Sequence, residues 1–189
     1  MFSRFGRPGA GLVAGAALTA AAALVSAAWA ATPSPGLGRA PGAAELAAID
    51  ISIMPDGHGL PAGSGTVEQG AAVYAAKCQA CHGANGAGGP NDRLTGGIGS
   101  LASPKPVKTI ASYWPYATTV FDYVRRAMPI TAPQSLTNDE VYAVTAYLLS
   151  VDAIVPKDAR LDADSLPKVR MPNRDGFVSW EPRERPKGR

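Results

Sequence analysis

KCQACHG, residues 77–83, contains both cysteines of the 189-residue chain and one of its two histidines. Two residues separate Cys78 from Cys81, and His82 follows the second thiol directly. Such a run is found in disulfides, in thiol-disulfide exchange sites, in zinc sites and at points where a prosthetic group is attached covalently. The compartment and the surrounding fold distinguish among these uses.

The first 30 residues have the form of an export signal. Arg4 and Arg7 precede an uncharged, alanine-rich run over residues 9–28, and Ala28-Trp29-Ala30 is a small-x-small cleavage site. We therefore expect cleavage after Ala30, a periplasmic location and no membrane segment in the mature chain. The alternative is an uncleaved anchor, because the run approaches the roughly 20 apolar residues that span a bilayer.

Charge and composition narrow the function further. The whole chain has 18 Lys and Arg against 15 Asp and Glu, and the loss of Arg4 and Arg7 brings the two signs nearly into balance. A near-neutral chain lacks the basic stripe of a nucleic-acid binder, so we expect no nucleic-acid partner. The 21 glycines and 17 prolines indicate long irregular stretches around a small core.

Helical patterns are confined to the middle of the chain. Thr66-Val67-Glu68-Gln69 has the form of a capping box and predicts a helix over residues 67–77. A second capping box, Thr137-Asn138-Asp139-Glu140, predicts a helix to about Ser150. Thr118 or Thr119 is the candidate cap of a third helix, which ends before a proline.

No alternating apolar run indicates a sheet, so the predicted fold class is all-α with three main short helices. We expect irregular extensions on both sides of this helical domain. The predicted boundaries are a signal peptide at 1–30, an N-terminal extension at 31–64, the helical domain at 65–152 and a C-terminal arm at 153–189.

Three short helices bury little surface, so a domain of this size needs a bound group at its centre. The spacing of Cys78 and Cys81 matches the two vinyl groups of a haem, and His82 is then carried beneath the ring to bind iron. The motif therefore predicts one covalently attached haem c. The rival uses explain less: a zinc site lacks a second C-x-x-C, an exchange site belongs in a strand-helix-strand unit, and a disulfide leaves His82 without a role.

Further residues resemble a family. These are Gly70 and Tyr74 before the motif, Gly89-Pro90-Asn91 after it, Met128-Pro129, and Ala146-Tyr147-Leu148 near the end of the last helix. With them, residues 65–152 resemble a class I c-type cytochrome. The resemblance implies that the first and last helices cross at Gly70 and Tyr74 against Val144 and Tyr147. It also implies that the Pro90 carbonyl accepts the second N–H of His82.

The sixth iron position separates an electron carrier from a catalyst. Haem with His and Met ligands has a raised potential and no open site, which suits electron transfer. Of Met54, Met128 and Met171, we expect Met128 as the ligand because it ends a helix before a proline, as the distal methionine does in the resembled fold. A packing role for Met128, a second histidine ligand from His58, and an open iron, as in a haem enzyme or gas-ligand sensor, are the alternatives.

Other polar and aromatic residues are candidate contacts of the haem. Trp114, within Tyr113-Trp114-Pro115-Tyr116, has a polar tip suited to a haem propionate, and packing is the alternative use. Arg125 and Arg126 are candidates to offset propionate charge or to meet an acidic partner. A solvated helix face is the default for such a pair.

A closer resemblance extends beyond the core, over about residues 50–178. The stretches that carry it are Gly59-Leu60-Pro61, Gly63-Ser64-Gly65-Thr66, residues 112–119, residues 123–129 and residues 171–177. They are similar to the cytochrome subunits of periplasmic molybdenum sulfite and sulfane dehydrogenases of the sulfur-oxidising type. The resemblance implies a molybdenum-containing partner subunit that oxidises sulfite or sulfane sulfur, a downstream cytochrome or oxidase, and no catalytic residue in this chain. Some members carry a second haem domain, whereas a single C-x-x-C-H here predicts one haem.

The C-terminal arm, residues 153–189, allows two interpretations. Its prolines and mixed charges are typical of a disordered tail. Its apolar residues instead favour an arm that lies along a partner. The candidate anchors are Met171, Phe177, Val178 and Trp180.

Overall fold

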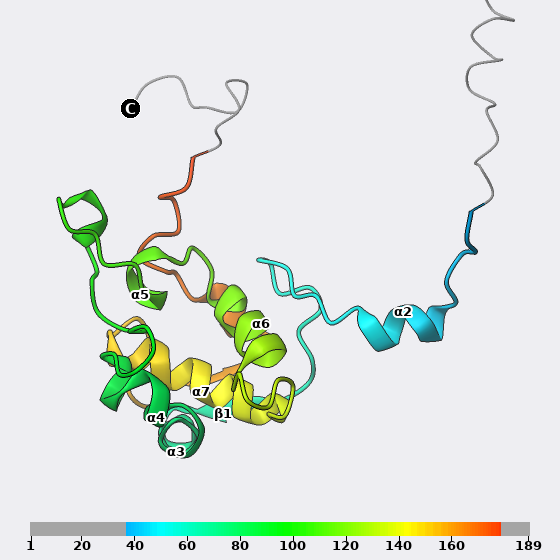
Figure 1. Ribbon diagram of the computed structural model, residues 1–189, viewed down its shortest axis with the longest axis horizontal. Helices are drawn as coiled ribbons and strands as arrows, with labels where there is room; N and C mark the ends of the chain where they lie inside the picture. The colour runs from blue at the N-terminus through cyan, green and yellow to red at the C-terminus, as the bar shows by residue number, and fades with distance from the viewer. Residues whose placement is uncertain (1–36, 179–189) are drawn as a thin grey trace, which may run out of the picture. The chain divides into compact units, whose positions relative to one another are not determined.

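The computed structural model describes residues 37–178 (Figure 1). The predicted signal at 1–30 and Trp180 lie outside the described residues. Within these residues the chain divides into two units between Leu46 and Ala47. In the first unit, Arg39 Nη1 and the backbone N–H of Gly42 each donate to Glu45 Oε2 at 2.8 Å, at the start of helix α2 (Ala43–Ile49).

Short helices dominate the second unit. In chain order its elements are β1 (Ser64–Thr66), α3 (Val67–Lys77), α4 (Gln79–His82), the 3-10 turns η1 (Ala84–Gly86) and η2 (Ser100–Ala102), α5 (Ile110–Tyr113), α6 (Ala117–Ala127), α7 (Asn138–Val151), β2 (Arg160–Asp162) and the 3-10 turn η3 (Leu166–Lys168). No helix within residues 37–178 is long and apolar enough to cross a membrane.

Both predicted capping boxes are present. At the start of α3, Gln69 N–H donates to Thr66 Oγ1 at 3.2 Å and Thr66 N–H donates to Gln69 Oε1 at 2.9 Å. At the start of α7, Thr137 and Glu140 make the same reciprocal pair at 3.2 and 2.8 Å. Each box satisfies two of the amide groups that a helix start leaves without partners, which is why local sequence fixes these two starts.

The third main helix starts earlier than predicted. Helix α6 begins at Ala117 with Tyr116 as its N-cap residue, so neither Thr118 nor Thr119 caps it. Thr118 is buried, and its hydroxyl donates to the Pro55 carbonyl at 3.3 Å. A tertiary contact therefore uses the hydroxyl that the sequence assigned to a cap. The helix ends at Ala127, before the Met128-Pro129 pair, as predicted.

A two-stranded sheet was not expected from the sequence. Strands β1 and β2 are antiparallel, with Ser64, Gly65 and Thr66 opposite Asp162, Leu161 and Arg160. Each strand has three residues, which is too short for an alternating pattern to be recognised. The sheet joins the start of the predicted helical domain to the C-terminal arm, beside α3 and α7.

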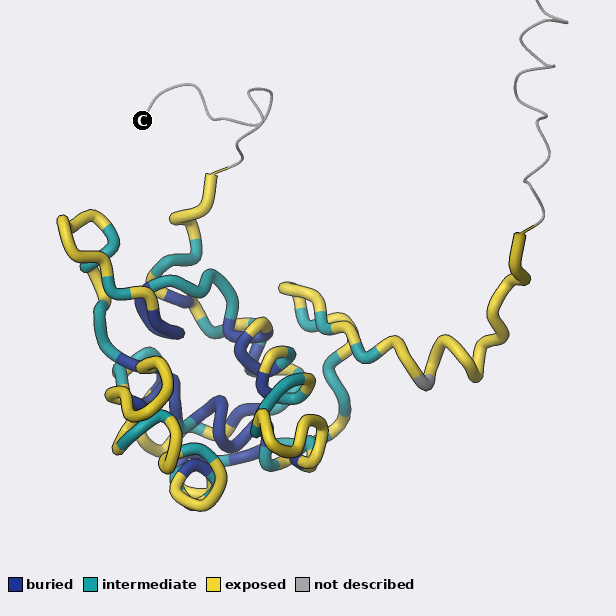
Figure 2. The backbone as a smooth tube through the Cα atoms, in the orientation of Figure 1, coloured by how far each residue is buried: buried dark blue, intermediate teal, exposed yellow. Residues whose placement is uncertain are grey.

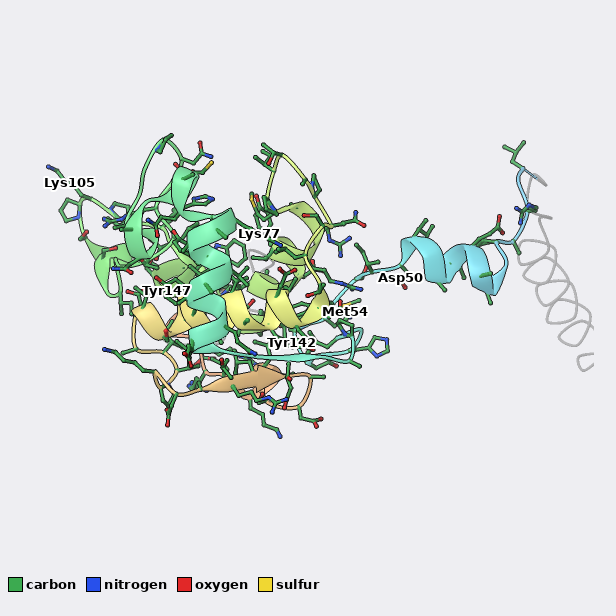
Figure 3. The ribbon with its side chains drawn as sticks, turned by 90° about the horizontal axis from the view of Figure 1, so that it is seen from below. Asp50, Met54, Lys77, Lys105, Tyr142 and Tyr147 are labelled. Carbon is green, nitrogen blue, oxygen red and sulfur yellow. The ribbon has the colours of Figure 1, made fainter. Side chains whose placement is uncertain are left out.

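The first and last main helices cross as the resemblance implied. A Cβ atom at Gly70 would overlap the Ala143 carbonyl, so only glycine allows α3 and α7 to lie this close. Beside this point the Tyr74 and Tyr147 rings lie 5.1 Å apart, centroid to centroid. The residue opposite Gly70 is Ala143, one position before the predicted Val144. Figure 3 shows α3 across α7, with Tyr147 labelled near the crossing.

Residues after α7 return to the core. Leu161, Leu166 and Met171 are buried among the helices, and η3 lies against α6 (Figures 1 and 2). Met171 is 1% exposed, so it is a core residue and the interpretation of it as a partner anchor is wrong. Phe177 and Val178 are 53% and 69% exposed. The described part of the arm thus completes the core and does not form a disordered tail.

Candidate functional site

A cavity of about 480 Å³ lies between the C-x-x-C-H segment and α6, within the range of roughly 300–1,000 Å³ typical of ligand pockets. We call its two sides the His82 wall, residues 78–94, and the Met128 wall, residues 108–136. Tyr74 and Lys77 of α3, with Val144 and Leu148 of α7, complete the lining. The lining of the cavity as a whole is mostly apolar, which suits a large flat hydrophobic group.

Both thiols and the imidazole come from one turn of chain. Cys78 ends α3, and its carbonyl accepts the N–H groups of Cys81 and His82 at 3.1 and 3.0 Å. All three side chains line the cavity, and both cysteines are free of a disulfide. The short helix α4, with Cys78 as its N-cap residue, therefore presents two sulfurs and one imidazole to the same space.

The imidazole of His82 is held by a backbone carbonyl. Its Nδ1 lies 2.8 Å from the Asp92 carbonyl oxygen. A carbonyl only accepts, so Nδ1 carries the proton and Nε2 keeps its lone pair for a metal. The predicted acceptor was the Pro90 carbonyl, and the structure places Asp92 there instead. Pro90 is exposed and does not line the cavity.

The path of the loop explains the shift from Pro90 to Asp92. Gly83 and Gly88 have φ of 74° and 105°, and the Gly88 N–H donates to the His82 carbonyl at 2.9 Å. The Asn91 N–H donates to the Cys81 carbonyl at 2.9 Å. Backbone groups of the residues up to position 91 are therefore engaged in closing the turn. The next carbonyl, that of Asp92, is the one that faces the imidazole.

Met128 lies in the opposite wall. It is the C-cap residue of α6, half-buried, and its N–H donates to the Val124 carbonyl at 3.1 Å. It is the only described methionine that lines the cavity, because Met54 is 49% exposed and Met171 is in the core. His58 is exposed, in a turn where Asp56 accepts its backbone N–H, and does not line the cavity. The structure thus brings Met128, and not His58, to the site.

Trp114 also lines the cavity. Its ring meets Tyr123 edge-on, with centroids 5.6 Å apart and an interplanar angle of 87°. Arg125 and Arg126 are not part of the lining. Arg126 donates to Asp122 at 2.7 Å and to the Ile51 carbonyl at 3.3 Å, so it joins the N-terminal extension to α6.

Three cationic side chains at the cavity were missed by the sequence analysis. Lys77, Arg93 and Lys108 line it. Lys77 pairs with Glu140 at 2.7 Å, whereas within residues 37–178 no carboxylate lies within ion-pair distance of Arg93 or Lys108. Only the position of Lys77, directly before Cys78, offered a sequence signal for any of them.

The geometry argues against a thiol-disulfide exchange site and against a zinc site. Burial raises the pKa of the Cys78 thiol, which lowers its thiolate fraction, whereas exchange enzymes lower the pKa of the attacking cysteine. Among the described residues, no three His, Cys, Asp or Glu side chains are grouped so that they could hold a metal ion by themselves. Two thiols, an oriented imidazole and a thioether around one apolar cavity fit a covalently tethered haem.

Comparison with known proteins agrees with this geometry. The family model described as cytochrome c matches residues 67–152. The crystal structure of the sulfane dehydrogenase SoxCD from Paracoccus pantotrophus contains a similar chain. The identity is 44%, the TM-score is 0.73, and the match covers 79% of this chain and 74% of that chain. The chain belongs to the cytochrome c family. The fold is that of a class I cytochrome c, as predicted, and the family implies covalent haem c.

A curated relative connects this cytochrome c to sulfur chemistry again. Thiosulfate dehydrogenase of Allochromatium vinosum is 30% identical over 108 residues. That match covers 54% of this chain and 39% of the relative, so the cytochrome spans well under half of that protein. The SoxCD match covers a larger share of this chain than residues 67–152 alone, and therefore includes part of the flanking segments.

Proposed function

We propose that this chain is a periplasmic cytochrome c with one haem that carries electrons from a molybdenum sulfite or sulfane dehydrogenase subunit to a downstream cytochrome or oxidase. The observation that carries the proposal is the meeting of Cys78, Cys81, His82 and Met128 in one apolar cavity. The similarity to a chain of sulfane dehydrogenase SoxCD supports the choice of electron donor.

Each residue has a defined part in holding the cofactor. Cys78 and Cys81 provide the two thioether tethers, and His82 offers Nε2 because the Asp92 carbonyl holds the proton on Nδ1. Met128, which lines the opposite wall, would offer its thioether to the iron. When bound, the haem supplies one-electron exchange at its iron. The apolar lining limits water at the site, which sets the reduction potential of such centres.

The end of α6 favours a carrier over an enzyme. Met128 follows the last helical residue, and its N–H bond to the Val124 carbonyl anchors its backbone to the helix end while its side chain lines the cavity. A methionine in this place would bind the iron of a haem in the cavity and so leave no open site for peroxide, carbon monoxide or nitric oxide.

The cofactor is tested by spectrum and mass. Purified periplasmic protein is expected to give a pyridine haemochrome spectrum of a doubly tethered haem, and a mass that equals the chain cleaved after Ala30 plus one haem. A colourless protein with the mass of the bare chain would contradict the proposal.

The sixth ligand is tested with two matched variants. Met128→Leu removes the thioether at the cavity, whereas Met171→Leu makes the same change in the core. We expect the absorption band of the methionine-iron bond to be lost only in Met128→Leu, which should then bind carbon monoxide rapidly in the ferrous state. Rapid binding by the unaltered protein would identify a sensor or enzyme instead.

The partner is tested by affinity capture. The tagged mature protein, expressed in its own host, is expected to retain a molybdenum-containing subunit, which metal analysis of the captured material would detect. Reduction of the haem on addition of sulfite or a sulfane donor to that material would identify the substrate class. Captured material without molybdenum and without haem reduction would contradict this part of the proposal.

A further inference from the structure

The stretch Met171-Pro172-Asn173-Arg174-Asp175-Gly176-Phe177 lies against the Met128 wall. We infer that Asn173 is a positioning residue that fixes the turn Tyr113–Tyr116 and thereby holds Trp114 at the cofactor cavity. The inference rests on the proposed function, because its effect is exerted on the haem. None of the residues proposed to hold the haem lies in this stretch, although it is one of those that carry the closer resemblance.

Three contacts join the stretch to the turn. The Asn173 amide Nδ2 donates to the Tyr113 carbonyl at 2.6 Å. The Arg174 guanidinium lies over the Tyr116 ring, 4.3 Å from its centroid. The Phe177 ring meets the Tyr113 ring edge-on at 5.2 Å. The contacts therefore fall on both sides of Trp114 and leave Trp114 itself to the cavity.

The Tyr113 carbonyl is a point where the chain needs an external partner. Helix α5 has only four residues, Ile110–Tyr113. The last carbonyls of a helix receive no hydrogen bond from N–H groups of the same helix, so they need another donor. Trp114 then leaves the helix in an extended conformation, with φ −73° and ψ 131°. The hydrogen bond from the Asn173 amide to the Tyr113 carbonyl fixes the plane of the peptide between Tyr113 and Trp114. This plane sets the direction in which the Trp114 side chain leaves the backbone.

The stretch is itself firmly placed. Met171 is buried in the core at its start, and its carbonyl accepts the Arg174 N–H at 3.1 Å. The Asn173 carbonyl accepts the Gly176 N–H at 3.1 Å. A Cβ atom at Gly176 would overlap Oδ1 of the Asn173 side chain. Gly176 is therefore the residue that leaves room for Asn173 to point at Tyr113.

Trp114 transmits this arrangement to the site. It lines the cavity with Met128 and rests edge-on against Tyr123, another lining residue. If the turn is released, the ring loses its fixed place and water gains access to that side of the cavity. Water stabilises the more highly charged oxidised centre, so the reduction potential falls.

The test uses the whole holoprotein and three single variants. Asn173→Asp keeps the shape but removes the donor, and Gly176→Ala displaces the Asn173 side chain without changing Asn173. The matched control is Asn138→Asp, because Asn138 Nδ2 also donates to a backbone carbonyl, that of Ala62 at 3.2 Å, away from the cavity lining. Haem content, reduction potential and Trp114 fluorescence, in a Trp180→Phe background, are measured for each.

We expect full haem content in all variants, and a shift of roughly tenfold towards the oxidised form in Asn173→Asp and Gly176→Ala, which is a potential lower by about 59 mV for one electron. Trp114 emission should rise in these two variants, since the ring moves from the quenching haem, and both readings should be unchanged in Asn138→Asp. Unchanged potential and emission in either folded, haem-loaded Asn173 or Gly176 variant would overturn the inference. Absence of haem from the unaltered protein would instead overturn the proposed function.

Discussion

The two walls of the cavity are stabilised in different ways. The His82 wall is closed mostly by bonds within its own segment and the residue that follows: the Gly86 carbonyl accepts from Leu94 and Thr95 at 2.7 and 3.2 Å, and the Thr95 hydroxyl donates to the Asn85 carbonyl at 2.8 Å. One long-range bond is added by the Tyr147 hydroxyl, which donates to Asn85 Oδ1 at 2.9 Å. The Met128 wall depends on distant segments that supply Ile51, Pro55 and Asn173 as partners. The His82 wall is therefore stabilised mostly by local bonds, whereas the Met128 wall also takes partners from both flanking segments.

The largest loss of stability is expected from a substitution in the His82 wall. Gly83 has φ of 74°, and a Cβ there would overlap the Gly88 carbonyl. Gly83→Ala should therefore lower the free energy of unfolding by roughly 3 kcal/mol or more, from backbone strain and overlap together. Gly99→Ala is the control, because Gly99 has φ of 80° with nothing within 4 Å, and should cost only about 1 kcal/mol. Equal losses in denaturant titrations would show that the wall tolerates a changed turn.

The next largest loss of stability is expected from a substitution in the segment that supports the Met128 wall. Met171→Ala leaves a cavity where a fully buried side chain packed, and should cost about 2–5 kcal/mol. Met54→Ala, at a half-exposed methionine of the other flanking segment, should stay within about 0.5 kcal/mol. Thermal or denaturant unfolding of the two holoproteins measures both. Similar stabilities would mean that the segment after α7 adds little to the core.

The pH dependence of stability tests a contact between α7 and the N-terminal extension. The buried Tyr142 hydroxyl donates to the Pro61 carbonyl at 2.9 Å, and burial raises the pKa of Tyr142 to about 12. Because the folded pKa lies above the unfolded value of about 10, its stabilisation is complete below pH 10 and is lost as pH rises towards 12. Tyr142→Phe should cost about 1 kcal/mol at neutral pH and make the alkaline decline shallower. An unchanged decline, followed by urea unfolding from pH 9 to 12, would assign the titration to other groups. Figure 3 labels Tyr142 on α7.

The smallest effect concerns a single contact of α6. Thr118→Val keeps the shape of a buried side chain and removes its bond to the Pro55 carbonyl, which should cost about 0.5–1 kcal/mol. Thr119→Val, at the exposed neighbour, is the control and should change stability by less than that. A larger loss at Thr119 would mean that this threonine, and not Thr118, stabilises the start of α6.

The predictable features are those that depend on neighbouring residues. The starts of α3 and α7 followed from capping boxes, because Thr66 and Thr137 bond to residues three positions away. The C-x-x-C-H spacing likewise places Cys78, Cys81 and His82 on one turn. The close approach of α3 and α7 at Gly70 was expected from the resemblance to a class I c-type cytochrome, and the structure confirms it with Ala143 as the residue opposite.

The features that were missed depend on residues distant in the sequence or on the detailed path of a loop. The acceptor for His82 moved from Pro90 to Asp92 because the bonds of the glycine turn, not the Gly-Pro pair, decide which carbonyl faces the ring. The start of α6 moved because Thr118 bonds to Pro55, far away in sequence. Met171 was assigned to a partner surface because nothing near it indicates that the chain returns to the core.

The ladder between β1 and β2 has a practical consequence for shortening the chain. A fragment that ends at Asp152 retains every residue proposed to hold the cofactor, yet it loses Ala159, whose carbonyl accepts the Val67 N–H at 3.1 Å. It also loses β2, so strand β1, which directly precedes α3, is left without its pairing partner. A shortened form of the protein should therefore keep both strands and extend past Phe177, well beyond the last helix.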